Sequence, residues 1–280
     1  MKYSALLVIP LVFFASQTID AQQQTSAPAS SPAPAVTAAP APVRPAVTSM
    51  TPRQLAILHA DIMMARKEFE EAIKAYDEVL VATPRDSEIL NKVGVAYQQL
   101  DQLNHAERYY KSSIKADKTY MSAVNNIGTV EYEKKHYAKA ISYYIKASKL
   151  HGDMSTVYSN LGYGYFADKE YPEAMSAFQK ALQLDPDIFI RRGGYGTTIQ
   201  QRTSTDPGLF YYFVAKTYAG AGDAEEAAHF LKLARDDGYT GFLSAQTDPA
   251  FAKVIKDPRV QEVLIVPPSY ARDRKPAMQN

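Results

Sequence analysis

Apolar, small and aromatic residues recur at a constant spacing through the middle of the chain, with mostly polar residues between them. The recurring positions are Gly94, Gly128 and Gly162; Ala72, Ala106, Ala140 and Ala174; and Tyr76, Tyr110, Tyr144 and Phe178. A period of about 34 residues with helical spacing inside it predicts a repeated pair of helices. Because one helix pair cannot bury its own apolar face, the repeats are expected to stack on one another. The pattern therefore predicts an all-α solenoid.

The small columns predict where the two helices of each repeat cross. We expect Gly94, Gly128 and Gly162 on the first helices to face the alanine column of the second helices. Small residues at a crossing let two helix axes approach within about 8 to 10 Å.

The repeat that begins near residue 155 carries the fullest version of the pattern. Its residues are Tyr158, Leu161, Gly162, Tyr165, Ala174, Phe178, Ala181 and Pro186. This pattern resembles the tetratricopeptide repeat family. The resemblance implies a right-handed superhelix of about five repeats, near 53–86, 87–120, 121–154, 155–188 and 208–238, within a domain spanning 53–238. It also implies a concave groove, lined by the first helices, that binds proteins.

An interruption of 19 residues, 189–207, separates the fourth repeat from the fifth. Its glycines disfavour a helix, and the stretch YGTTIQQR has β-type composition, so we expect a loop or a short hairpin. Three interpretations stay open: a tolerated excursion, a flap that shapes the partner site, and a phosphate cradle. The flap would use Arg191, Arg192 and Tyr195.

Two Asp-Pro pairs follow the fifth repeat, at Asp248 and at Asp257. Each is typical of an N-cap followed by proline in the first helical turn. We therefore predict a helical cap over residues 239–267 that covers the end of the stack. Residues 268–280 read as a disordered tail.

The first 52 residues read as two segments that precede the repeats. Residues 1–21 contain an apolar run of 11 residues, which is short against the roughly 20 needed to cross a bilayer, and are interpreted as a cleavable signal peptide. Residues 22–52 are rich in proline and alanine and are interpreted as a disordered linker. These segments predict a periplasmic or secreted protein with no stable membrane insertion once the signal is removed.

Composition argues against several classes of chemistry. The chain has no cysteine, which excludes disulfides, thiolate metal sites and cysteine nucleophiles. Its 31 basic residues balance 30 acidic residues, so no overall field favours nucleic acid. The five histidines lack the spacing of a metal site or of a catalytic base and its partner. We therefore expect no enzyme activity, no cofactor and no metal.

One helical stripe of each first helix, at i, i+4 and i+7, is expected to line the groove. Its candidate partner-binding residues are Asn91, Gln98, Asn125, Thr129, Tyr132, Ser159, Tyr163, Phe166, Tyr212 and Lys216. Amides can bond to a ligand backbone, and aromatic rings offer rigid contact area. The main prediction is a non-catalytic scaffold in the bacterial cell envelope that binds a protein or an extended peptide.

Two alternatives stay open. The first is a carbohydrate or small-ligand binder that uses the aromatic end of the groove together with the glycine-rich interruption. The second is an accessory module for an enzyme in another chain. A glycan array would separate the first alternative from the main prediction.

Overall fold

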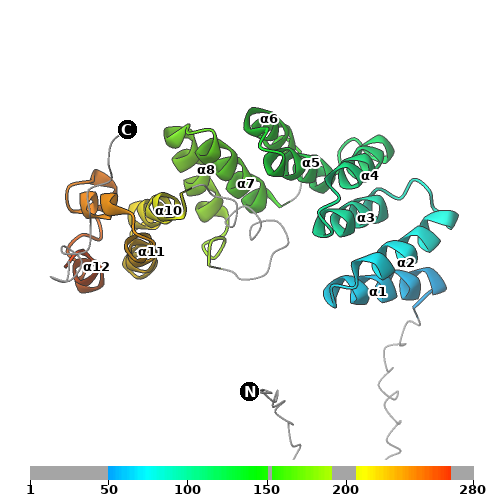
Figure 1. The fold of residues 1–280 in the computed structure, drawn as a ribbon, viewed down its shortest axis with the longest axis horizontal. Coiled ribbons are helices and arrows are strands. Elements are labelled where there is room, and N and C mark those ends of the chain that lie inside the picture. Colours follow the sequence, from blue (N-terminus) through cyan, green and yellow to red (C-terminus); the bar gives the residue numbers. More distant parts are fainter. Residues whose placement is uncertain (1–49, 151–152, 191–205, 266–280) are drawn as a thin grey trace, which may run out of the picture. The chain divides into compact units, whose positions relative to one another are not determined.

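The computed structural model describes residues 50–150, 153–190 and 206–265, which form a series of paired helices (Figure 1). The first helices of the pairs are α1 (Pro52–Ala65), α3 (Ser87–Gln99), α5 (Met121–Glu133), α7 (Met154–Ala167) and α10 (Pro207–Ala221). The second helices are α2 (Phe69–Ala82), α4 (Leu103–Ala116), α6 (Tyr137–Ala147), α8 (Tyr171–Leu184) and α11 (Ala224–Asp236). These described ranges contain no β-strand, which confirms the all-α prediction.

Each second helix packs against its own first helix, and the second helices of the first four pairs also pack against the first helix of the next pair. Thus α2 contacts α3, α4 contacts α5, α6 contacts α7, and α8 contacts α10. Such nearest-neighbour packing is the property that defines a solenoid. The predicted stack of helix pairs is confirmed.

The turn inside each repeat keeps the period of the sequence in its backbone. Lys67, Asp101, Lys135 and Lys169 all have φ between 58° and 65° in these turns. This left-handed conformation is costly for a residue with a Cβ, so the packing on both sides must hold it in place. In the fifth pair the same turn uses Gly222, with φ of 90°. Gly222 lies 53 residues after Lys169, which is one repeat plus the 19-residue interruption.

The crossing of the two helices is built differently from the prediction. A Cβ added to Gly128 would lie 2.6 Å from Cε1 of Tyr144, and one added to Gly94 would lie 2.5 Å from Cε1 of Tyr110. The glycines therefore face the aromatic column, and the expectation that they face the alanines is wrong. The alanine one turn earlier, such as Ala140, is also fully buried. A flat ring fills the space that glycine leaves, which the spacing of the columns did not reveal.

Aromatic packing joins the fifth pair to the fourth. Phe210 of α10 stacks on Tyr163 of α7, with ring centroids 5.1 Å apart. Phe189 makes edge contacts with Phe178 at 5.4 Å and with Tyr218 at 6.1 Å. Phe189, the first residue of the predicted interruption, is thus part of the core. The predicted loop or hairpin falls mostly on residues 191–205, outside the described residues. Residues 1–49 and 266–280, which include the predicted signal peptide, most of the predicted linker and the predicted tail, also lie outside them.

The stack ends in three short helical segments, η1 (Thr240–Gln246), η2 (Pro249–Phe251) and α12 (Pro258–Leu264). The Asp248 side chain accepts a hydrogen bond from the Ala250 amide at 3.0 Å, and that of Asp257 accepts one from the Arg259 amide at 2.9 Å. Phe251 and Val260 are fully buried against the stack. The helical cap is therefore present, and the 3-10 turn η1 is an addition that the Asp-Pro pairs did not predict.

Substituting Gly128 by alanine tests the crossing. Because the added Cβ must displace the Tyr144 ring, we expect Gly128→Ala to lower the free energy of unfolding by about 1 to 3 kcal/mol. Gly220→Ala is the matched control, because Gly220 also lies on a first helix, α10, and its added Cβ would meet nothing closer than 3.7 Å. The control should leave stability unchanged or raise it by up to about 1 kcal/mol. Urea denaturation measures both, and equal effects would contradict the assigned contact.

Candidate functional site: a polar pocket on the first helices

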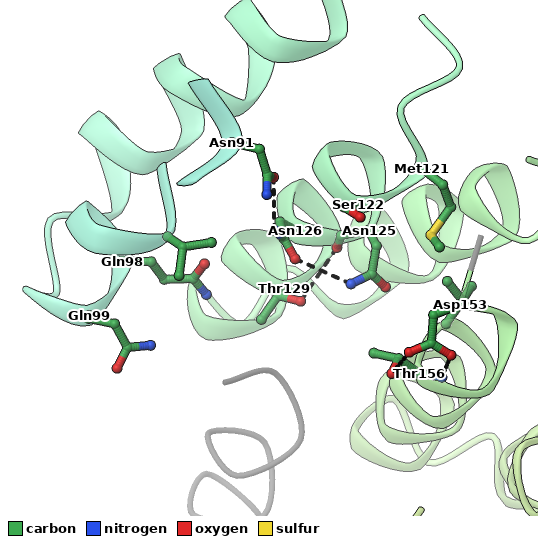
Figure 2. A pocket seen from close by; sticks show the side chains of 12 residues that line it. Asn91, Gln98, Gln99, Met121, Ser122, Asn125, Asn126, Thr129, Asp153 and Thr156 are labelled. Carbon is green, nitrogen blue, oxygen red and sulfur yellow. Dashed lines mark hydrogen bonds between the residues drawn. The ribbon is translucent and has the colours of Figure 1, made fainter. Parts of the chain in front are cut away.

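A pocket of about 290 Å³ opens between the first helices of the second, third and fourth repeats (Figure 2). Most of its lining residues carry amides or hydroxyls, and Val95, Met121 and Val157 add apolar surface. The main polar contributors are Asn91, Gln98 and Gln99 of α3, Ser122 and Asn126 of α5, and Thr156 of α7. Groups of this kind both donate and accept hydrogen bonds.

Side-chain hydrogen bonds between asparagines cross the three helices below this pocket. Asn160 of α7 donates to Oδ1 of Asn125 on α5 at 3.0 Å. Asn125 donates to Oδ1 of Asn126 at 3.3 Å, and Asn126 donates to Oδ1 of Asn91 on α3 at 3.0 Å, as Figure 2 shows for the last two. Asn125 and Asn91 are buried, so these bonds form in a medium where lost partners are costly. These hydrogen bonds, which we call the asparagine ladder, therefore fix the orientation of amides that line the pocket.

A second chain of hydrogen bonds runs from the pocket rim to an acidic group. The Tyr110 hydroxyl donates to Oε1 of Gln98 at 2.7 Å, and Nε2 of Gln98 donates to the Glu133 carboxylate at 2.7 Å. Burial raises the pKa of Glu133 to about 7, and the nearby charge of Asp101 acts in the same direction. The Gln98 hydrogen bond opposes this rise. Gln98 thus reaches both the pocket and a carboxyl group that titrates near neutral pH.

Four of the predicted partner-binding residues line this pocket, namely Asn91, Gln98, Asn125 and Thr129. Ser159 continues the same column into α7, but it is fully buried and is not part of the lining. Its Oγ and Oδ1 of the neighbouring Asn160 have no hydrogen-bond partner among the described residues.

The aromatic part of the predicted stripe is buried, so the expectation that it offers exposed contact area is wrong. Tyr132, Tyr163, Phe166 and Tyr212 are all at most 7% exposed. Their rings pack on neighbouring helices, as when Phe166 meets Phe213 of α10 edge-on at 5.6 Å. The i, i+4 and i+7 spacing places a residue on one side of a helix. It does not show how closely the first helix of the next repeat approaches that side.

The terminal cap covers the last part of the predicted groove. The Tyr212 hydroxyl lies 2.7 Å from Oγ of Ser244 and donates to Asp248 at 3.1 Å. Nζ of Lys216 forms an ion pair with Asp248 at 2.7 Å. Both predicted groove residues therefore hold the cap in place, and the prediction that they face a partner is wrong. The predicted flap residues Arg191, Arg192 and Tyr195 lie outside the described residues.

Several pocket residues were missed by the sequence analysis. Asn126, Gln99, Ser122, Asp153 and Thr156 line the pocket but are not among the residues predicted from the stripe. They lie beside the single stripe or at the starts of α5 and α7. The 35-residue offset between Asn91 and Asn126 was the available signal, because it pairs residues that lie side by side on consecutive repeats.

Within the described ranges, no group of three or more His, Asp or Glu side chains is arranged to hold a metal ion. The helices of those ranges are all too short or too polar to cross a membrane.

Comparison with known proteins bears on the family. Sequence models of the tetratricopeptide repeat match residues 155–188 and 87–120. The chain is a tetratricopeptide repeat protein. These two matches coincide with α7 and α8 and with α3 and α4 of the stack. No curated protein matches the sequence.

Several solved structures are similar to the chain. PilF of Pseudomonas aeruginosa is 18% identical, with a TM-score of 0.51, covering 76% of this chain and 86% of that one. MamA is 25% identical, with a TM-score of 0.44, covering 64% of this chain and 93% of that one. PilW, titled a type IV pilus biogenesis factor, is 14% identical, with a TM-score of 0.49, covering 77% and 91%. The likeness to PilF supports the fold and nothing beyond it.

The raised pKa of Glu133 predicts how stability depends on pH. Because the folded-state pKa lies above that of an unfolded glutamate, this group favours the folded state at low pH, and that contribution is lost as pH rises through about 7. Glu133→Gln removes the charge but keeps an acceptor for Gln98. We expect it to raise the free energy of unfolding by about 1 to 2 kcal/mol at pH 8 and to change little at pH 4.

The exposed Glu173 of α8 supplies the control substitution, Glu173→Gln. Urea titrations at a series of pH values compare the three proteins. If Glu133→Gln follows the pH profile of the parent chain, the carboxyl group does not titrate as described.

Proposed function

We propose that this tetratricopeptide repeat protein is a non-catalytic scaffold that binds an extended segment of a partner protein across α3, α5 and α7. The observation that carries the proposal is the polar pocket, in which amides of consecutive repeats sit side by side. A side-chain amide carries both a donor and an acceptor, as a peptide group does, so it can bond to a ligand backbone in either direction. The asparagine ladder holds these amides in place before a ligand arrives, which lowers the entropy cost of binding.

We place the protein in the periplasm or outside the cell. The support is the sequence of residues 1–21, with one lysine, a short apolar run and a polar stretch that ends in Ala21. Residues 22–52 would then act as a tether between the processed end and the repeats.

The carbohydrate alternative has lost its basis in the groove. It required exposed rings, and Tyr163, Phe166 and Tyr212 are buried. A small ligand would have to use the amide pocket, where the described residues offer no stacking platform. A peptide segment fits this chemistry better.

Site-specific photocrosslinking tests the pocket in cells. A photoreactive residue at Gln99, on the pocket rim, is expected to form adducts with the partner, whereas one at the exposed Lys232 of α11 is not. Ser122→Trp, which fills the pocket, should abolish the Gln99 adducts. Ser176→Trp, at an exposed serine on α8, is the matched control and should leave them intact.

Two results would count against the proposal. Adducts that form only from Lys232 would place the partner on another surface. Adducts from Gln99 that survive Ser122→Trp would show that the segment near Gln99 does not enter the pocket.

A further inference from the structure

The second helices of the first two repeats expose opposite charges on neighbouring faces. On α2, Glu70, Glu71 and Glu78 are exposed, with Lys74 as the one cation among them. We call these three carboxylates the acidic stripe. Glu70 and Glu71 lie about two helical turns before Glu78, which places all three on one side of α2, together with Lys74.

The basic stripe lies on α4 and consists of Arg108, Lys111 and Lys115. All three are exposed, and their i, i+3 and i+7 spacing places them on one side of the helix. Glu107 lies beside them, but its side chain is only 17% exposed and is already paired with Lys111 at 2.5 Å and with Lys134 at 2.6 Å. The stripe therefore keeps a positive charge.

Side-chain contacts join the helices that carry the two stripes. Tyr109 of α4 packs against the buried cluster formed by α1, α2 and α3, and its hydroxyl donates to Asp77 of α2 at 3.4 Å. On the other side, α6 continues the basic surface with the exposed Lys139 and Lys146. Tyr143 of α6 and Ile114 of α4 pack against the same buried residues.

An apolar side chain lies in the same region. Val81, in the last turn of α2, is 85% exposed, the most exposed of the large apolar residues in the described ranges. A lone exposed valine is ordinary on its own. Next to adjacent acidic and basic stripes, it adds an apolar contact to a surface that is otherwise electrostatic.

We propose that two copies of this chain associate through these faces, with the acidic stripe of one copy against the basic stripe of the other. Adjacent stripes of opposite sign make a surface that is complementary to itself. A two-fold rotation between them then pairs both stripes at once and gives a closed dimer. Nucleic acid and anionic lipid fit less well, because the same face would bring their phosphates against the α2 carboxylates. The pocket lies on the first helices, so dimer formation is independent of the proposed partner site.

Sedimentation equilibrium of the full chain tests the dimer. We expect a dimer at about 50 mM NaCl, with a Kd that rises about tenfold or more at about 500 mM, because salt screens exposed charges. Reversing one stripe should give monomers at either salt concentration. The two reversed chains are R108E/K115E, which makes the face acidic, and E71K/E78K, which makes it basic.

Mixing the two reversed chains is the decisive step. Each is expected to be monomeric alone, but an equimolar mixture should form a heterodimer, because one face is now acidic and the other basic. K180E/K232E, at exposed lysines of α8 and α11, is the control with the same charge change as R108E/K115E and should remain dimeric. Far-UV circular dichroism and thermal melting show whether the variants are folded, which we expect since all of the substituted side chains are exposed.

Three results would overturn the proposal. The parent chain remains monomeric at about 100 µM in low salt; the dimer persists when a stripe is reversed; or the mixture of the two folded reversed chains stays monomeric.

Discussion

The contact between a glycine and an aromatic ring inside the second, third and fourth helix pairs is the constraint on which the stack depends. Gly128 leaves room for the Tyr144 ring, and the same contact recurs at the equivalent positions of the repeats on either side. Because ring atoms occupy the space that a Cβ of the first helix would take, the contact sets the distance and the register of the two helices. The costly left-handed turn at Lys135 is then held between two packed helices. Repetition of this unit places Asn91 and Asn125 on neighbouring first helices and so builds the pocket.

The helix pairs and their order could be predicted from the sequence because packing in a solenoid is local. A residue's neighbours come from its own repeat or the next one, so a constant period implies most of the contacts. The same locality explains why Gly222 occupies the turn of the fifth pair despite the interruption. What could not be predicted was the partner of each glycine, because alanine and tyrosine one turn apart on the second helix both repeat with the same period.

The candidate site was only partly predictable, for a related reason. Asn91 and Asn125 were found because they lie on the stripe that the first helices present. Tyr163 and Phe166 lie on the same stripe, yet they are buried by Phe210 and Phe213 of α10 across the interruption. The end of the groove is occupied by the chain's own cap, which ties down Lys216 through Asp248. Periodicity assigns a residue to a surface, but the approach of the next element decides whether that surface is open.

A double-mutant cycle between Gly128 and Tyr144 tests the central contact most directly. The four proteins are the parent chain, Gly128→Ala, Tyr144→Leu and the double variant, each measured by urea denaturation. If the added Cβ destabilises the fold by meeting the ring, the smaller leucine relieves it, and the double variant should lose at least about 1 kcal/mol less than the two single variants lose together. Losses that add within about 0.5 kcal/mol would show that the two residues do not touch and would contradict the account.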